Sequence, residues 1–537
     1  MRKWTPLMAV CLGTLMLLVD ITIVNVALPD ISSDLGASFS DLQWVIDIYA
    51  LVLATLLLAT GSLADAWGRR RVYIAGLVIF AVSSMACGLA QNALELVIAR
   101  GVQGAGGAAM FATTIALLNM SYLGKDRGVA YGIWGAVSGA AAGLGVVLGG
   151  VLVEFVSWRW IFFVNLPITV AAVVLSLVAF RAEEPRQIRL DFAGMVTFIV
   201  AAGAVTYGMI RAGEDGWEDL GTVIALGLGG AAFLLFALIE FLSEEPLIDL
   251  RLLRRPRFLG VNLSAAALSF SAFGYFALLS IWLQTVNEMT PVEAGLSFLP
   301  LTITAFVVSG VTGKLLKDTS PTWVIGAAVI LIGVGALMMR MLGVAYTWQA
   351  MIPGQIVTGV GVGLASPLIA AAALGSVPAS RSGMASGLVN TGRQLGLAFG
   401  VALLGTVFQS AATTSLTDAG APQAAQTAQG IAAGGTAQIL ASVPAQSRGP
   451  AEQAMHTAFA DGLDMVFLVA GIAALAVGIL FLVLARGPAT PDVADLDMPP
   501  RYIGRHRAPT VTVGRHGGRT GRHTQASSEP QTALSRS

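Results

Sequence analysis

The feature that most constrains this chain is a series of uncharged apolar stretches, each long enough to cross a lipid bilayer. A transmembrane helix needs about twenty predominantly apolar residues. Only helices and closed barrels satisfy their backbone groups in lipid, and the stretches lack the two-residue alternation of a barrel strand. The sequence therefore predicts an all-α integral membrane protein. The uncharged stretches are 72–90, 129–153, 192–210, 220–239, 258–286, 321–339 and 465–485.

Composition supports this class. Charged residues make up 12% of the 537-residue chain and hydrophobic residues 55%, whereas soluble domains carry about a quarter charged residues. The hydropathy pattern predicts about fourteen transmembrane helices. We expect them near 6–28, 43–63, 72–90, 93–117, 129–153, 161–180, 192–210, 220–241, 258–283, 292–312, 321–341, 349–375, 383–409 and 461–485.

Basic residues alternate between the two sides of these spans. With the N-terminus inside, the arginine clusters 69–71 and 251–257 fall in cytoplasmic loops, while the first outer loop is acidic. This asymmetry follows the positive-inside rule and places both termini in the cytoplasm. An arginine-, alanine- and glycine-rich composition is typical of a GC-rich bacterial genome. We therefore expect a multi-pass protein of the bacterial cytoplasmic membrane.

Two segments fall outside the predicted spans. Residues 410–460 are rich in Ala, Gln, Thr and Gly and are expected to face outward. Residues 486–537 form a polar tail with interspersed arginines, which predicts a disordered cytoplasmic segment. Its function is either weak attraction to anionic lipid or none beyond solvation.

Ionisable residues inside spans are rare, because burying a charge in hydrocarbon is costly, and they are therefore functional candidates. Asp20 in the first span and Arg100 in the fourth are expected at the same depth. They could bind a proton and a substrate in competition, or form a structural ion pair that fixes helix register. Arg393 in the thirteenth span could line a cavity or extend to the interface. Asp47 and Glu95, near outer span ends, are expected to contact water.

Two glycine-containing motifs suggest conformational roles. In the turn 61–71, Gly61 and Gly68 permit a tight turn, and Asp65, Arg69 and Arg70 could bridge helix ends; an ordinary basic loop is the alternative. The fifth span has glycines spaced for close helix approach or bending, with simple packing as the alternative. These are Gly139, Gly143, Gly145, Gly149 and Gly150. Cys11 and Cys87 lie within spans, so no disulfide is expected.

Several chemistries are excluded by the sequence. No G-x-x-x-x-G-K-[ST] motif for nucleotide binding is present. The four histidines are His456, His506, His516 and His523, all outside the predicted spans, which excludes an intramembrane histidine metal site. We therefore expect neither an enzyme nor a bound cofactor, and energy would come from an ion gradient. Nothing in the sequence indicates nucleic-acid binding or an accessory periplasmic partner, and it leaves the oligomeric state open.

Six blocks in order carry a family resemblance. DITIVNVALP (20–29), GSLADAWGRR (61–70) and ARGVQGAGGA (99–108) resemble signatures of the fourteen-span drug/proton antiporter branch of the major facilitator superfamily, the EmrB/QacA type. WRWIFFVNLP (158–167), PLIDLRLLRRPRF (246–258) and GMASGLVNTGRQLG (383–396) are similar to its later blocks.

The resemblance implies a six-helix bundle over 1–180, two inserted helices over 181–249 and a second six-helix bundle over 250–485. It also implies proton coupling by Asp20 and Arg100, and a conformational latch of Gly61, Asp65, Gly68, Arg69 and Arg70. Asn25, Gln103 and Arg393 are candidates to line a central cavity that alternates access.

Two departures from the family pattern bear on mechanism. Val146 follows Gly145 where the antiporter signature has proline, and spans nine to thirteen hold no carboxylate expected to be buried. The resemblance implies proton-coupled export of small amphipathic molecules such as drugs. The alternatives are a dedicated exporter of one endogenous metabolite, lipid or siderophore, and, more remotely, a non-transporting sensor or a membrane enzyme.

Overall fold

The computed structural model describes residues 2–181, 191–243, 250–315, 321–340, 347–376 and 382–485. The predicted tail 486–537 lies outside these residues. Every regular element in the described ranges is a helix. The first group comprises α1 (Thr5–Leu35), α2 (Phe39–Trp67), α3 (Arg69–Leu89), α4 (Ala93–Ser121), α5 (Gly124–Phe155), α6 (Trp160–Phe163) and α7 (Asn165–Ala179), preceded by the turn η1 (Arg2–Trp4).

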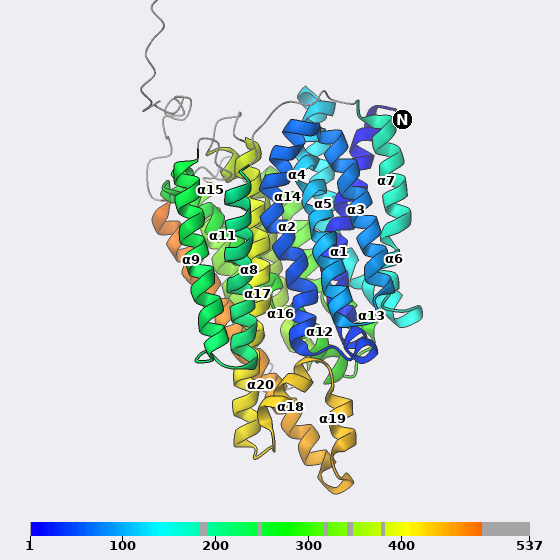
Figure 1. Ribbon diagram of the computed structural model, residues 1–537, viewed down its shortest axis with the longest axis vertical. Coiled ribbons are helices and arrows are strands. Elements are labelled where there is room, and N and C mark those ends of the chain that lie inside the picture. Colours follow the sequence, from blue (N-terminus) through cyan, green and yellow to red (C-terminus); the bar gives the residue numbers. More distant parts are fainter. Residues whose placement is uncertain are drawn as a thin grey trace, which may run out of the picture. The chain divides into compact units, whose positions relative to one another are not determined.

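Two inserted helices follow, α8 (Phe192–Glu214) and α9 (Leu220–Leu242), and they pack on each other as a hairpin. Asp191 and Asp219 cap their first turns by accepting hydrogen bonds from the backbone N–H groups of Gly194 and Thr222. Helix α8 also contacts α2 of the first group and α17 of the second. The pair therefore lies beside both groups of helices (Figure 1).

The second group begins at Leu250. Its helices are α10 (Leu250–Leu253), α11 (Pro256–Phe273), α12 (Phe276–Thr285), α13 (Pro291–Ser297), α14 (Leu299–Leu315), α15 (Pro321–Met338), α16 (Ile352–Leu374), α17 (Ser382–Asp418), α18 (Ala424–Ala432), α19 (Thr436–Ser442) and α20 (Arg448–Leu484), with short turns η3 (Trp348–Met351) and η5 (Ala445–Ser447).

Twelve helical segments of the described ranges are long and apolar enough to cross a membrane. Helices α5 and α15 occupy the predicted spans 129–153 and 321–341, and each contributes a shorter apolar segment, Gly143–Phe155 and Trp323–Met338. The all-helical membrane architecture is confirmed, and the number fourteen stays a prediction.

The outward segment predicted at 410–460 is largely helical. Helix α17 continues to Asp418 and α20 already begins at Arg448, so both run beyond the expected ends of their spans. Between them α18 and α19 form a small cap at the end of the bundle opposite the N-terminus (Figure 1). We call this the cap end and the opposite one the N end. Ile431 and Ala432 of the cap are fully buried, which anchors it to the bundle.

The two groups of helices meet closely near the cap end. The Gln284 side chain of α12 donates a 3.0 Å hydrogen bond to the carbonyl oxygen of Val26 in α1. A Cβ added at Gly150 of α5 would lie 2.5 Å from the carbonyl oxygen of Pro291. Only glycine permits this approach of the two backbones.

Candidate functional site

Asp20 lies at the centre of a buried polar cluster in the first group of helices. Its side chain is 0% exposed on α1, which packs against α4, α5 and α7. One carboxylate oxygen, Oδ2, accepts a 2.5 Å hydrogen bond from Nη1 of Arg100. The other, Oδ1, accepts from Nε2 of Gln103 at 2.8 Å and from Nδ2 of Asn165 at 3.1 Å. Both oxygens therefore act as hydrogen-bond acceptors, and each has at least one donor.

Arg100 of α4 is held from several sides. Its Nε donates to the carbonyl oxygen of Val45 in α2 at 3.0 Å, and Nη1 also donates to Oε1 of Gln103 at 2.7 Å. The guanidinium carbon lies 4.2 Å from the ring centroid of Tyr49, a cation–π contact. Arg100 is 1% exposed. Besides Asp20, three groups on α2 and α4 thus hold the guanidinium in place: the Val45 carbonyl, the Tyr49 ring and the Gln103 side chain.

A second layer of polar groups orients the amides. Ser84 of α3 accepts hydrogen bonds from Nε2 of Gln103 at 2.8 Å and from Nδ2 of Asn165 at 3.3 Å. Asn165 is the first residue of α7, so its side chain enters the cluster where that helix begins. The cluster joins α1, α2, α3, α4 and α7. Its hydroxyl and amide groups fix the positions of the Asp20 carboxylate and the Arg100 guanidinium.

The energetics of this pair make it a sensitive site. Two opposite charges removed from water lose solvation, and their attraction repays it only with good geometry and additional hydrogen bonds. Asp20 and Arg100 have both. Removing one charge would leave the other uncompensated in the protein interior, which costs several kcal/mol. Any event that neutralises Asp20, such as protonation, must therefore rearrange Arg100 and its partners.

Glycines of α5 bring neighbouring backbones close to this cluster. A Cβ at Gly145 would lie 2.8 Å from the carbonyl oxygen of Val19, and one at Gly149 would lie 2.8 Å from that of Ile23, both in α1. Gly143 faces Thr302 of α14 and so reaches the second group. The surroundings of Gly139 lie outside the described side chains.

Val146 replaces the expected proline without interrupting the helix. It is fully buried within α5, which runs from Gly124 to Phe155. Its carbonyl oxygen would lie 2.5 Å from a Cβ at Gly295 of α13, so this position also forms part of the contact between the two groups. Proline would remove one backbone donor here.

The remaining predicted cavity residues lie apart from the cluster. Asn25 is buried on α1, and its amide donates to the carbonyl oxygens of Ile21 and Thr22 of the same helix. Arg393 on α17 is partly exposed. Only Gln103 of the three cavity candidates contacts Asp20 and Arg100.

The predicted turn 61–71 is shorter than the sequence indicates. Helix α2 continues through Gly61 to Trp67, and only Gly68 separates it from α3. Gly68 has φ 96°, a conformation that favours glycine. Arg70 donates from Nη2 to the carbonyl oxygen of Leu177 in α7 at 3.2 Å. The Asp65 side chain lies outside the described residues, and Arg69 has an interaction of its own.

Sequence reasoning missed Ser84, Asn165 and Tyr49. The signal for Asn165 was available, since it is an amide within the otherwise apolar predicted span 161–180. The expectation that water reaches Asp47 is wrong, because its side chain is 0% exposed. Glu95 is exposed as expected and accepts hydrogen bonds from the backbone of Gln91 and the side chain of Asn92.

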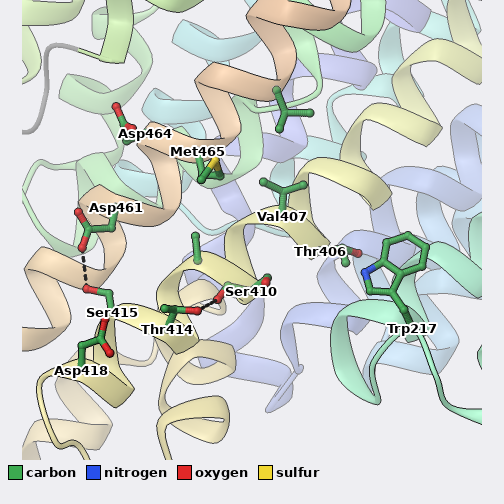
Figure 2. Close-up of a pocket in the computed structure, with 12 residues that line it drawn as sticks. Trp217, Thr406, Val407, Ser410, Thr414, Ser415, Asp418, Asp461, Asp464 and Met465 are labelled. Carbon is green, nitrogen blue, oxygen red and sulfur yellow. Dashed lines mark hydrogen bonds between the residues drawn. The ribbon is translucent and has the colours of Figure 1, made fainter.

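A separate groove of about 620 Å³ opens at the cap end between α17, α20 and the turn that joins α8 to α9 (Figure 2). Trp217 of the turn lies at one side, and the carboxylates Asp418, Asp461 and Asp464 lie toward the other. Asp461 accepts a 2.6 Å hydrogen bond from Ser415, and Asp464 pairs with Arg340 at 2.8 Å. The groove is thus lined by acidic and apolar side chains and lies apart from the Asp20 cluster.

Comparison with known proteins agrees with this architecture. The sequence model of the Major Facilitator Superfamily matches residues 10–401. The chain is 37% identical over 410 residues to the multidrug resistance protein Stp of Mycobacterium tuberculosis, covering 75% of each protein. It is 31% identical to the tetracenomycin C resistance and export protein of Streptomyces glaucescens, covering 91% of this chain and 93% of that one.

Another relative is also named for antibiotic resistance, and a solved transporter structure has a similar fold. The puromycin resistance protein of Streptomyces alboniger is 35% identical, covering 82% of this chain and 89% of that protein. Among solved structures, a bacterial homologue of the human lysosomal transporter Spinster matches with a TM-score of 0.64 and 16% identity, covering 90% of this chain and 97% of that one. The fold and the relatives together establish that the chain belongs to the Major Facilitator Superfamily, and is a membrane transporter rather than an enzyme.

Proposed function

We propose that this protein is a proton-coupled antiporter that exports small amphipathic molecules, including drugs, by alternating access. The observation that carries the proposal is the ion pair between Asp20 and Arg100, fully buried among five helices. Intramembrane ionisable groups mark ion and proton pathways in transporters. The relatives named for multidrug and antibiotic resistance support the substrate class.

In this proposal Asp20 binds the transported proton. While ionised it holds Arg100, Gln103 and Asn165 by hydrogen bonds. A proton arriving on Asp20 cancels its charge and weakens the hold on the guanidinium. Arg100 is bonded to the backbone of α2 at Val45, so its shift moves α2 relative to α1. Proton binding thereby moves the helices at the contact surface between the two helix groups. We call this contact surface the seam; it includes the Gln284–Val26 hydrogen bond and the close approach of Gly150 to Pro291.

We further propose the orientation and the domain division. The cap end faces outward and both termini are cytoplasmic, as the distribution of basic residues indicates. The bundles over 1–180 and 250–485 rock about the seam, and the inserted helices over 181–249 flank it. The one-residue turn at Gly68, with Arg70 tied to α7, acts as the cytoplasmic latch. The protein resides in the cytoplasmic membrane of a bacterium.

The test is efflux of a fluorescent cationic dye into everted membrane vesicles energised by a pH gradient. Wild type is expected to accumulate the dye, a protonophore to abolish accumulation, and Asp20→Asn to fail while still inserted in the membrane. Asp41→Asn, which alters a partly exposed carboxylate in the capping box of α2, is the matched control. Equal accumulation by wild type and Asp20→Asn across a pH series would refute the role of Asp20.

The names of the relatives favour a second candidate, export of one dedicated compound. Tetracenomycin C and puromycin resistance proteins are named for single antibiotics. A narrow profile, with resistance to one endogenous product and no dye transport, would favour this candidate. The proton-coupling residues would be the same in both cases.

A further inference from the structure

A carboxylate outside the Asp20 cluster is completely buried and has no hydrogen-bond partner among the described residues. Asp47 of α2 is 0% exposed, and neither of its side-chain oxygens forms a hydrogen bond in the described part of the protein. It lies eight residues from the start of α2 at Phe39, about 12 Å from the cap end of that helix. An isolated ionised carboxylate in such surroundings is so costly that the group takes up a proton instead.

The position of Asp47 on α2 places it at a junction of three helices. Gln43 and Ala54 of α2 form hydrogen bonds to α17, through Val401 and Thr391 respectively. On the neighbouring face, the Trp44 ring packs against Tyr207 of α8 at 6.3 Å between centroids. At about 100° per residue, Asp47 falls between these two faces. It therefore lies where the first helix group, the inserted pair and the second group meet.

The same level of this junction contains a second unsatisfied polar group. Leu51 of α2 faces Gly203 of α8, and Trp44 faces Tyr207, so Asp47 is level with Thr206. Thr206 is 0% exposed, and its hydroxyl forms no hydrogen bond in the described structure. Burying a polar group without a hydrogen bond costs free energy. We therefore expect Asp47 and Thr206, which lie at the contact between the two helix groups, to find partners in another state of the transporter.

Among the described side chains, no charged group pairs with Asp47. The helices packed on α2 are α1, α3, α4, α8, α17 and α18, and Asp20 and Arg100 are bonded to each other. Arg211 of α8 is hydrogen-bonded to Tyr207 and Asp219. The hydrogen bonds of Gln43 with Val401 and of Ala54 with Thr391 set the register of α2 against α17. In this register Arg393 of α17 lies about one helical turn nearer the N end than Asp47. The described ionisable side chains of α2 and these helices are Cys11, Asp20, Asp30, Asp34, Asp41, Asp47, Tyr49, Arg69, Arg70, Arg71, Tyr73, Cys87, Glu95, Arg100, Tyr207, Arg211, Arg393 and Asp418.

We propose that Asp47 is a second proton-binding site of the transport cycle, separate from Asp20 and occupied while the seam at the cap end is closed. This proposal rests on the proposed function. When the halves separate at the cap end, water reaches Asp47 and Thr206, and the carboxyl group exchanges its proton with the outer solution. Closure of the seam then requires a proton on Asp47, because an ionised carboxylate would be buried unpaired. Proton binding and closure are thereby linked.

The hydrogen bonding of the two buried carboxyl groups, Asp20 and Asp47, differs in this structure. Asp20 accepts three hydrogen bonds, one of them from a guanidinium, as an ionised group does. Asp47 accepts none. The two sites are therefore loaded in different phases of the cycle. At a driving force of about 100 mV, each additional proton supports roughly a fiftyfold steeper accumulation of substrate.

Infrared difference spectroscopy on the full-length protein in liposomes tests the protonation directly. Wild type and Asp20→Asn at neutral pH are expected to show the carbonyl stretch of a protonated carboxyl group that Asp47→Asn lacks. The same carbonyl band in wild type and Asp47→Asn would overturn the proposal. This measurement needs no substrate, so it remains decisive for Asp47 even if the protein moves no dye and the proposed function fails.

Transport assays test the role of that proton. With the cationic dye, Asp47→Asn is expected to retain counterflow exchange within about twofold of wild type, because exchange needs no net proton movement, and to lose most of the roughly fiftyfold proton-driven accumulation. Asp47→Glu should restore part of it. Asp41→Asn, which neutralises a partly exposed carboxylate near the start of the same helix, should accumulate dye like wild type. Accumulation by Asp47→Asn with the wild-type pH profile would overturn the proposal.

Discussion

The side-chain amide of Gln43 in α2 donates a 3.0 Å hydrogen bond to the backbone carbonyl oxygen of Val401 in α17, joining the two helix groups near the cap end. A Cβ at Gly405, one turn further along α17, would lie 3.0 Å from the amide carbon of the same side chain. Gln43 therefore fills a fixed space in the seam as well as forming a bond across it.

Gln43→Ala should weaken closure of the cap end. A lost buried hydrogen bond costs about 0.5–1.5 kcal/mol, so the ratio of open to closed states should rise roughly two- to tenfold. The measurement is the labelling rate of a cysteine introduced at Ala277, a buried residue lining a small cavity between the groups, with both native cysteines replaced. Gln426→Ala, on the exposed surface of α18, is the control. An unchanged labelling rate in Gln43→Ala would contradict the role of Gln43 in holding the cap end closed.

Neutralising one member of the buried ion pair should destabilise the protein more than neutralising both. Arg100→Met leaves Asp20 charged and unpaired, at a cost of about 3–5 kcal/mol, whereas Asp20→Asn with Arg100→Met removes both charges. We expect the thermal unfolding midpoint of the purified protein to fall in Arg100→Met and to recover in the double variant. Proton-driven transport should be absent from both. A double variant no more stable than Arg100→Met would show that the charges do not act as a pair.

Enlarging Gly149 should separate α1 from α5. A Cβ here would lie 2.8 Å from the carbonyl oxygen of Ile23, so Gly149→Ala is expected to cost about 1–3 kcal/mol of stability. Gly227→Ala in α9 is the matched control, because nothing lies within 4 Å of its added Cβ. The comparison uses the thermal midpoints of the two variants. A smaller loss for Gly149→Ala than for Gly227→Ala would contradict the packing.

The turn between α8 and α9 should loosen in acid. The hydrogen bond from Arg211, followed by that from the backbone of Thr222, holds the pKa of Asp219 below its usual value. A lowered pKa stabilises the turn above the ordinary carboxyl pKa, and this stabilisation is lost as pH falls through the lowered value, below about pH 4. Hydrogen exchange over 211–222, corrected for intrinsic rates, should increase there. Arg211→Gln should shift the increase to higher pH, and an identical pH profile would exclude the pairing.

The sequence was sufficient to predict the helical membrane architecture, because uncharged runs of this length leave few alternatives in lipid. It also placed Asp20 and Arg100 at equal depth, where the two charges could pair or could compete for a proton and a substrate. It could not supply Ser84 or Tyr49, because a serine or tyrosine in a helix is compatible with many neighbours. Their roles arise only when α2 and α3 pack on α4.

The expectation for Asp47 failed for a related reason. Distance from the end of a span does not by itself set water access, because access depends on what packs on that face of the helix. Helices α8 and α17 cover the face of α2 that carries Asp47. The hydropathy of α8 and α9 alone does not indicate which helices they pack against. Likewise the extension of α17 and α20 beyond the apolar runs depends on contacts with the cap, which composition does not reveal.

Helix α17 runs unbroken over 37 residues from Ser382 to Asp418, a length of about 55 Å. Arg393 lies near one end and the cap beside the other. If α17 tilts as a rigid rod about a point near Ser382, a small displacement close to that point becomes several times larger at Asp418, beside the cap. The cap therefore follows any tilt of α17. With the cap end facing outward, as proposed above, an antibody fragment that immobilises the cap would arrest the bundle without entering the transport pathway.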